Sequence, residues 1–183
     1  MKNNKPAIFF DRDGIINVEK NYVHKISDFE FIEGIFDIAK KAKRNNYLLF
    51  VITNQAGIGR GLYSEHEFHI LNNWMLEQFE KNNAEIDKVY FCPDHPQYGE
   101  GKYRKDSFNR KPNPGMILKA CSEFEVDIDN SILVGDKISD IDAGISAGIK
   151  TNLLLNNKIK ENKNFFIKIN KILEIEKYLI RGT

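Results

Sequence analysis

The sequence predicts an α/β fold of the Rossmann-like type, in which helices cover both faces of a parallel β-sheet. Short apolar runs of strand length alternate along the chain with segments of helical periodicity, and polar or Gly/Pro segments bound each run. This alternation is typical of parallel strands joined by crossover helices. A chain of 183 residues suits one domain, residues 1–183, with a full hydrophobic core of its own.

Apolar runs and helical spacing place the expected elements. The strands are Ala7–Phe10, Leu48–Thr53, Val89–Cys92, Ile132–Gly135 and Asn152–Leu155. The helices between them are Ile35–Arg44, Ser64–Asn82, Met116–Phe124 and Asp140–Ala147. The second helix opens with Ser64-Glu65-His66-Glu67, a capping-box pattern. The tail is expected to add a weak edge strand, Phe165–Ile169, and a closing helix, Ile172–Ile180. The irregular segment 93–114 is long for a loop, which indicates a functional role.

Composition and charge argue against several functional classes. Hydrophobic residues make up 42% of the chain and charged residues 29%, with a net charge of +1 and no basic stripe, so we expect no nucleic-acid partner. No run approaches the roughly 20 apolar residues that cross a bilayer, so no membrane partner is expected. Cys92 and Cys121 form no disulfide framework, and no signal-peptide pattern precedes Ala7. We therefore expect a monomeric, cytoplasmic protein.

Two carboxylates follow the first expected strand directly. Asp11 and Asp13 lie two residues apart behind Ala7–Phe10, so an extended chain places both on one side at the strand's carboxyl end. Open α/β sheets bind their ligands at that edge. Adjacent carboxylates are costly to bury unpaired, which favours a divalent cation with phosphate chemistry beside it. The alternative is an Asp-rich turn, with Gly14 and Asn17 as turn formers.

A glycine-rich segment follows the second expected strand. Thr53, Asn54 and Gln55 begin it, and three glycines follow by residue 61. A hydroxyl, two amides and free backbone N–H groups there can donate to phosphate oxygens. The alternative is an ordinary loop between a strand and a helix.

Cations and further acids complete the pattern. Arg110 and Lys111 stand immediately before a helix start, and prolines at 112 and 114 stiffen the preceding backbone. This rigid frame favours side chains that point into a site over side chains that are solvated on the surface. Asp136 and Asp140 follow the strand Ile132–Gly135.

Asp-x-Asp, Thr, Lys and Gly-Asp thus occur in this order, each at the carboxyl end of an expected strand. This order resembles the four motifs of the haloacid dehalogenase-type phosphatases, over nearly the whole chain. Segments 11–17, 53–61 and 110–116 resemble a narrower group, the D-glycero-D-manno-heptose 1,7-bisphosphate phosphatases, with the histidinol-phosphate phosphatases close by. Segments 22–24 and 29–34 also look like the heptose enzymes. The resemblance implies a haloacid dehalogenase-like fold with a minimal cap.

The resemblance, together with the chemistry of the residues, implies roles for the motifs. Asp11 is the expected nucleophile, which forms an aspartyl-phosphate, and Asp13 the expected acid and base. Like-charge repulsion from neighbouring acids is expected to keep Asp13 protonated at the start. Thr53 and Lys111 would hold the phosphoryl oxygens. Mg²⁺ suits an all-oxygen site, and its expected ligands are the Asp11 side chain, the Asp13 carbonyl and the Asp136 side chain.

One acid keeps more than one possible role. Asp140 would orient metal-bound water or Lys111, or it would serve the N-terminus of the following helix.

Substrate selection has to come from residues outside the shared core. The candidates are Glu19, Lys20, Asn21, Tyr22, Asn54, Gln55, Arg110 and Lys137. Because a sugar bisphosphate carries a second dianion, Arg110 and Lys137 suit its remote phosphate, whereas Glu19 would accept sugar hydroxyls. The function implied is removal of the 7-phosphate of the heptose bisphosphate. The alternatives are a histidinol-phosphate phosphatase and, in another class, a catalytically silent binding protein of the same fold.

The chain departs from its resembling family at a zinc site. Many of those enzymes hold structural zinc with Cys-x-His and Cys-x-Cys. Here Cys92 remains, Asp94 stands in the histidine position, and Ser107 and Asn109 replace the later cysteines, with His95 one place out of register. Zinc needs four ligands in a tetrahedron, so no zinc is expected. Cys92 is expected to be buried at a strand end, and the aromatic side chains at 98, 103 and 108 are expected to anchor the loop.

Overall fold

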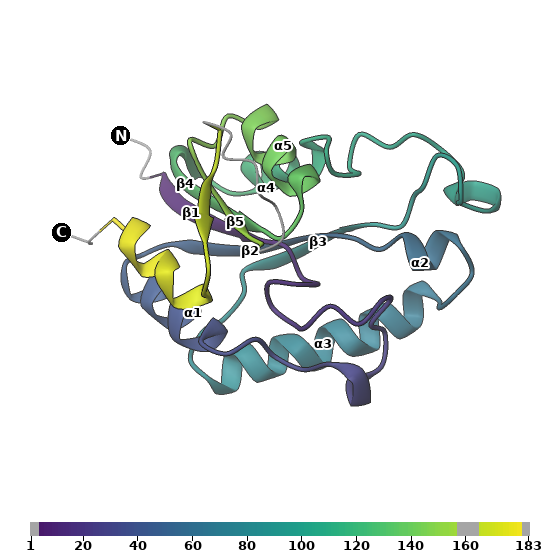
Figure 1. Ribbon diagram of the computed structural model, residues 1–183, viewed down its shortest axis with the longest axis horizontal. Coiled ribbons are helices and arrows are strands. Elements are labelled where there is room, and N and C mark those ends of the chain that lie inside the picture. The colour runs from purple at the N-terminus through teal and green to yellow at the C-terminus, as the bar shows by residue number, and fades with distance from the viewer. Residues whose placement is uncertain (1–3, 157–164, 181–183) are drawn as a thin grey trace.

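The computed structural model describes residues 4–156 and 165–180, and its centre is a six-stranded parallel sheet of order β3-β2-β1-β4-β5-β6 (Figure 1). All five strand pairings are parallel. The strands are β1 (Lys5–Phe10), β2 (Leu48–Asn54), β3 (Lys88–Cys92), β4 (Val126–Gly135), β5 (Thr151–Leu155) and β6 (Ile167–Ile169).

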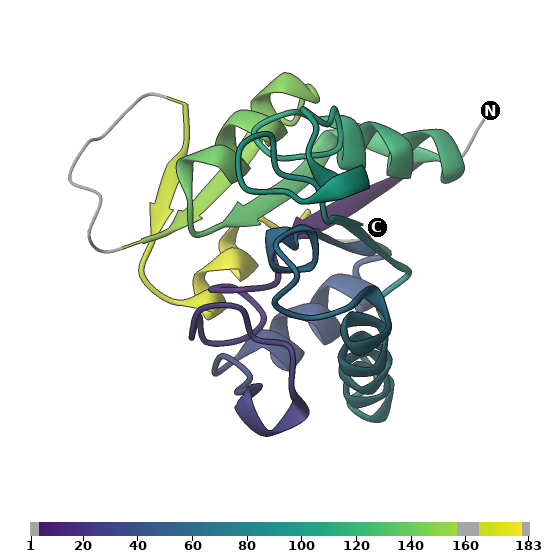
Figure 2. The same ribbon diagram turned by 90° about the vertical axis from the view of Figure 1, so that its right-hand side faces the viewer.

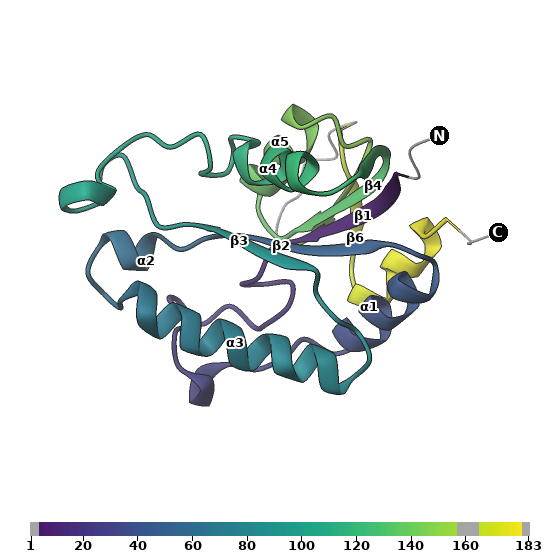
Figure 3. The ribbon, with the colours of Figure 1, turned by 180° about the vertical axis from the view of Figure 1, so that it is seen from behind.

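Helices cover both faces of the sheet, as predicted (Figure 3). They are α1 (Ile35–Arg44), α2 (Ala56–Gly59), α3 (Glu65–Lys81), α4 (Gly115–Glu123) and α5 (Ile138–Ser146), with 3-10 turns η1 (Ile26–Asp28), η2 (Gly101–Tyr103) and η3 (Ile172–Tyr178). Apolar residues of α1, α3 and η3 pack on one face, and those of α4 and α5 pack on the other. Ile8 and Phe10 of β1 join the first core, whereas Ala7 and Phe9 join the second. Because successive side chains of a strand point to opposite faces of the sheet, β1 contributes to both cores.

The carboxyl ends of the strands open toward one edge of the molecule, which faces the viewer in Figure 2. Two long segments leave the sheet there, residues 11–34 after β1 and residues 93–114 after β3. Apart from isolated bridges, η1 is the regular element of the first segment and η2 that of the second. No folded cap is inserted within these two fully described segments, which agrees with the predicted minimal cap.

Most element predictions are confirmed, and two need correction. Helix α1 has the predicted bounds, and Ser64 caps α3 with the full capping box. The predicted closing helix is present as a 3-10 helix over residues 172–178, two residues shorter than predicted. Strand β4 begins six residues earlier than predicted, at Val126, and α2 was not predicted. Within residues 4–156 and 165–180, no helix is both long and apolar enough to span a bilayer.

Candidate active site

A cavity of about 530 Å³ lies at the carboxyl edge of the sheet. It gathers most of the residues that the sequence predicted for the site: Asp11, Asp13, Glu19, Asn21, Tyr22, Thr53, Asn54, Gln55, Arg110, Lys111 and Lys137. Asp11 follows β1 directly and Thr53 belongs to β2, so parallel pairing of these strands brings segments 42 residues apart to one edge. Volumes of this order accommodate small-molecule ligands.

A buried lysine neutralises two acids at the base of the cavity. The Nζ atom of Lys111 lies 2.8 Å from Asp11 Oδ1 and 2.7 Å from Asp140 Oδ1, and it donates to the Ile52 carbonyl at 2.8 Å. An ammonium has three N–H donors, so all of them are occupied. Asp140 also accepts a hydrogen bond from the backbone N–H of Lys137 at the start of α5. Asp140 therefore combines two of its predicted roles, since it orients Lys111 and serves a helix N-terminus.

Three carboxylates meet beside this lysine. Asp11, Asp136 and Asp140 each offer an oxygen, and these oxygens lie within 4.8 Å of one another. Asp136 Oδ1 is buried and has no hydrogen-bond donor. A Cβ atom at Gly14, whose φ is +96°, would lie 2.5 Å from Asp136 Oδ2, so a side chain there would displace the acid. An all-oxygen, under-neutralised cluster fits Mg²⁺.

Burial and nearby carboxylates raise the pKa of two of these acids, Asp11 and Asp136. Burial raises the pKa of Asp11 to about 7, with Asp140 and Asp13 adding to the rise against the opposing charge of Lys111. Burial also raises the pKa of Asp136 to about 6. Burial lowers the pKa of Lys111, but the charges of Asp11 and Asp140 outweigh this effect and raise it overall. A divalent cation would favour both ionised carboxylates, which supports the fit of the site to a metal.

Asp13 is held by three donors that belong to the protein. Arg12 Nη2 lies 3.0 Å from both of its carboxylate oxygens, Asn17 Nδ2 donates to Oδ1 at 3.1 Å, and Gln55 Nε2 donates to Oδ2 at 3.0 Å. Both oxygens of the Asp13 carboxylate thus face hydrogen-bond donors. Arg12, which is 1% exposed, was missed as a site residue. An arginine between two motif acids would have been its only sequence signal.

The last residues of β2 and the residue after it contact one another and the backbone of Lys111. Asn54 pairs in both directions with the backbone of Lys111, because its Oδ1 accepts from the N–H and its Nδ2 donates to the carbonyl, both at 3.0 Å. Gln55 Nε2 donates to Thr53 Oγ1 at 2.7 Å. Tyr63 donates to Gln55 Oε1, and burial raises the pKa of this phenol. Tyr63 lies outside the sequence motifs and was not predicted as a site residue.

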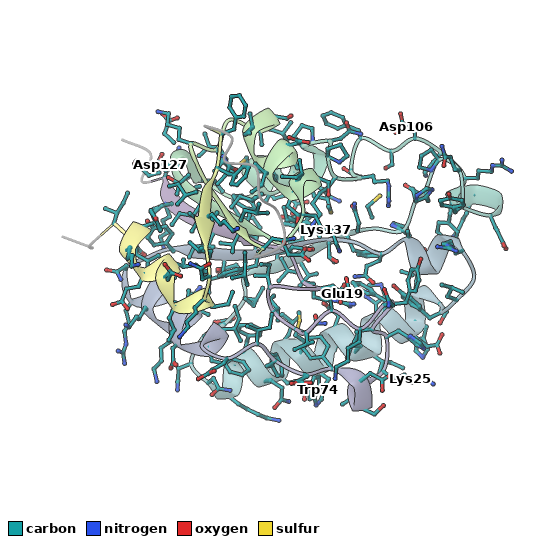
Figure 4. The ribbon with its side chains drawn as sticks, in the orientation of Figure 1. Glu19, Lys25, Trp74, Asp106, Asp127 and Lys137 are labelled. Atoms are coloured by element: carbon teal, nitrogen blue, oxygen red, sulfur yellow. The ribbon has the colours of Figure 1, made fainter. Side chains whose placement is uncertain are left out.

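The loop after β1 forms one wall of the cavity. Glu19 accepts from Lys137 Nζ at 3.2 Å, and the two side chains lie side by side near the centre of Figure 4. Asn21 and Tyr22 both have φ of +57°, an uncommon left-handed backbone for residues other than glycine. Lys20 does not line the cavity, and its ammonium pairs with Glu30 at 2.9 Å instead. The geometry therefore does not support the predicted substrate contact of Lys20.

The opposite wall comes from residues 93–114. Arg110 reaches the cavity from this segment, and its Nη1 donates to the carbonyl of Asp94 at 3.1 Å. The Asp94 carboxylate is buried, with Lys105 Nζ at 3.6 Å and Cys92 Sγ at 3.8 Å. Cys92 is buried at the end of β3, as predicted. His95 Nδ1 accepts from the backbone N–H groups of residues 97 and 98, so it serves its own turn.

One of the three predicted loop anchors is wrong, because the Phe108 side chain is 62% exposed. Tyr98 is 58% exposed, but its ring packs against His95 of the loop and against the guanidinium of Arg60 outside the loop. Tyr103 does anchor it, because its hydroxyl donates to Glu65 Oε1 and its ring packs against the cluster of Ile58, Tyr63 and Phe68. The periodicity of a loop carries no information about which aromatic side chain turns inward.

Solved structures show which fold class the chain shares. A crystal structure of a candidate haloacid dehalogenase-like (HAD-like) phosphatase from Mesorhizobium loti superimposes with a TM-score of 0.87 at 31% identity. The match covers 96% of this chain and 85% of that one. A heptose 1,7-bisphosphate phosphatase from B. bronchiseptica, complexed with magnesium and phosphate, superimposes with a TM-score of 0.82 at 21% identity, covering 95% and 97%. A family model described as HAD-hydrolase-like matches residues 108–167. The fold is that of the HAD-like hydrolases.

Named relatives show to which family of HAD-like hydrolases the chain belongs. A D-glycero-α-D-manno-heptose-1,7-bisphosphate 7-phosphatase from Burkholderia mallei is 54% identical, covering 85% of this chain and 81% of its own. One from Campylobacter jejuni is 46% identical over 92% of both chains. The corresponding β-anomer enzyme from Vibrio cholerae is 46% identical over 82% and 81%. The chain belongs to this family of heptose-bisphosphate phosphatases within the HAD-like hydrolases.

Proposed function

We propose that the protein removes the 7-phosphate of D-glycero-D-manno-heptose 1,7-bisphosphate through an aspartyl-phosphate intermediate. The observation that carries the chemistry is the contact of Lys111 with Asp11 and Asp140 at the base of the cavity. The sugar is proposed because the 46–54% identical relatives are named for it. The relatives' names include both anomers, so the proposal covers the heptose bisphosphate without choosing between them.

Asp11 would attack phosphorus and become an acyl phosphate. A phosphate dianion repels a nucleophile, so charge around it has to be neutralised before an in-line attack. As Asp11 passes its charge to the transferring group, the ammonium of Lys111 loses one of its two carboxylate partners. Its freed donor can then follow the phosphoryl oxygens. Thr53, whose oxygen already accepts from Gln55, has its own hydrogen free to donate to the same group.

Mg²⁺ would be held by Asp11, Asp136 and the Asp13 carbonyl, which is the predicted ligand set. When bound, it would neutralise phosphoryl charge and keep Asp11 ionised. Asp136 Oδ1, which accepts no hydrogen bond, and the raised pKa of both acids support this assignment. Asp140, the third member of the acidic cluster, is already neutralised by Lys111 at 2.7 Å, so its first task would be to orient that lysine.

Asp13 would protonate the leaving sugar oxygen and later take a proton from water. Both of its carboxylate oxygens accept from Arg12, and further donors come from Asn17 and Gln55. To act as an acid it has to give up at least one of these hydrogen bonds. The surrounding donors therefore define its resting position, and the arriving substrate would compete with them for the carboxyl group.

The uncleaved phosphate would be bound by two cations that line the cavity. Arg110 is half-buried and its planar fork suits a phosphate. Lys137, which directly precedes α5, also lines the cavity, and its ammonium donates to Glu19. Histidinol phosphate has one phosphate and a cationic amine, so it offers no second dianion to these residues. This difference in charge favours a sugar bisphosphate over that alternative.

The test is to measure kcat/KM for the heptose 1,7-bisphosphate, in both anomers, and for histidinol phosphate side by side with Mg²⁺ present. We expect the bisphosphate to be preferred by at least about tenfold, the scale of one lost charge-assisted contact. Equal or greater efficiency with histidinol phosphate would contradict the proposal.

A further inference from the structure

A buried tyrosine outside the sequence motifs contacts the catalytic groups through one glutamine. The Tyr63 hydroxyl lies 2.5 Å from Gln55 Oε1, and Gln55 Nε2 donates to both Asp13 Oδ2 and Thr53 Oγ1. Tyr63 and Gln55 are both buried and both line the cavity. A single amide group thus joins the phenol to two residues that the proposed function places in catalysis.

The two ends of a glutamine amide have nearly the same shape but opposite polarity. Gln55 can serve Asp13 only if its NH₂ end faces the carboxylate, because its oxygen end would repel it. The phenol O–H supplies a donor that the oxygen end of the amide can accept. Tyr63 therefore fixes which end of Gln55 faces the site.

The same orientation determines how the Thr53 hydroxyl is used. A hydroxyl has one hydrogen and two acceptor lone pairs. Since Gln55 occupies one lone pair as a donor, the hydrogen of Thr53 stays available for a phosphoryl oxygen. A flipped amide would instead accept that hydrogen and remove it from the site.

The ring of Tyr63 is held firmly in place. His24 stacks on it with ring centroids 4.9 Å apart and planes 1° from parallel. On another side the ring approaches Gly57 so closely that a Cβ atom there would lie 2.2 Å from Tyr63 Cε1. The close approach requires glycine at position 57, so the local backbone is built around this ring.

We propose that Tyr63 is a positioning residue, which orients Gln55 so that Asp13 and Thr53 keep the hydrogen-bond polarity that phosphoryl transfer needs. The inference rests on the proposed function in that Asp13 and Thr53 act on the phosphoryl group. It does not depend on which sugar carries that group.

The experiment compares wild type with Tyr63→Phe, Gln55→Met and the double variant. Phenylalanine keeps the ring and its stacking on His24 but removes the hydroxyl. Tyr90→Phe is the matched control, since the buried Tyr90 also donates its hydroxyl, to Glu123, on β3 away from the cavity. For each protein, kcat and KM are measured with the heptose bisphosphate and with p-nitrophenyl phosphate, together with Tm.

We expect Tyr63→Phe to lower kcat about tenfold with KM nearly unchanged, the effect of one lost hydrogen bond expressed in the transition state. Tyr90→Phe should keep wild-type kcat, and the two variants should have similar Tm values. In the Gln55→Met background, Tyr63→Phe should lower kcat no further, because the shared partner is already gone.

A wild-type kcat for Tyr63→Phe would overturn the inference, as would an equal loss in both backgrounds. If wild type cleaves only p-nitrophenyl phosphate, the heptose assignment fails and the same comparison still decides the role of Tyr63. If wild type cleaves neither ester, both proposals are overturned.

Discussion

The ammonium of Lys111 lies 2.8 Å from the carboxylate of Asp11, although the two residues are separated by one hundred positions in the sequence. The contact forms because Asp11 directly follows β1, while Asn54, at the end of the adjacent β2, pairs with both the N–H and the carbonyl of Lys111. Both side chains are almost fully buried. A buried pair of this kind is costly to break on one side only, so each partner constrains the other.

Arg110→Ala separates recognition from chemistry. If Arg110 holds the phosphate that is not cleaved, its loss should remove roughly 1.5–3 kcal/mol of transition-state stabilisation with the heptose bisphosphate. The value of kcat/KM for that substrate should then fall by about one to two orders of magnitude. A small monoester such as p-nitrophenyl phosphate lacks the second dianion and should be little affected. Steady-state kinetics on both substrates provide the measurement.

Lys111→Ala is the matched comparison for that experiment. The partner of Lys111 is the phosphoryl group in transfer, so Lys111→Ala should lower kcat/KM by a similar factor for both substrates. Equal losses on the two substrates for Arg110→Ala would instead assign Arg110 to the shared catalytic core, and the bisphosphate proposal would lose its main physical support.

Metal content gives a second prediction. We expect activity to vanish on treatment with EDTA and to return with Mg²⁺, because the acidic cluster offers only oxygen ligands. We also expect no stoichiometric zinc, since Asp94, Ser107 and Asn109 occupy three of the four family positions. Elemental analysis of protein purified without chelators measures both metals. About one tightly held zinc ion per chain would show that the loop binds metal through other ligands.

Metal-free protein should become more stable as the pH falls from 8 to 5.5. The pKa values of Asp11 and Asp136 are raised to about 7 and about 6 in the folded chain, whereas unfolded aspartates titrate near 4. Between these values the folded state binds protons that the unfolded state does not, so lowering the pH favours folding. We expect a gain of at least about 1 kcal/mol, or roughly 2–4 °C in Tm.

The control for this effect is the double variant Asp11→Asn, Asp136→Asn, which removes both titrating groups. Its Tm should change less between the two pH values than that of the parent. Mg²⁺ should stabilise the parent more at pH 8 than at pH 5.5, because it competes with protons for the carboxylates. The same pH dependence in parent and double variant would assign the effect to other groups.

The sequence predicts the centre of the fold well because five strands are apolar runs that the helices bury on both faces. It misses the first part of β4, where Asp129 and Asn130 are exposed and interrupt the apolar pattern. The tail pattern of apolar residues does not distinguish η3 from an α-helix, because three- and four-residue spacings overlap over two turns.

Site residues are predictable where a strand end fixes the position of the side chain, as for Asp11, Thr53 and Asp136. The direction of the Lys20 side chain is not predictable in this way, because its loop contains two left-handed residues and has no regular periodicity. Arg12 and Tyr63 were missed for a different reason. Their roles arise from contacts with Asp13 and Gln55 that only the folded chain creates.

The central claim is that Asp11 accepts the 7-phosphate of the heptose bisphosphate. The most direct measurement follows the ³¹P NMR spectrum of D-glycero-D-manno-heptose 1,7-bisphosphate with Mg²⁺ and either wild-type protein or Asp11→Asn. Wild type should convert the 7-phosphate signal to inorganic phosphate and leave the 1-phosphate signal in place, whereas folded Asp11→Asn should leave both signals unchanged. Loss of the 1-phosphate first, or appreciable turnover by folded Asp11→Asn, would contradict the account.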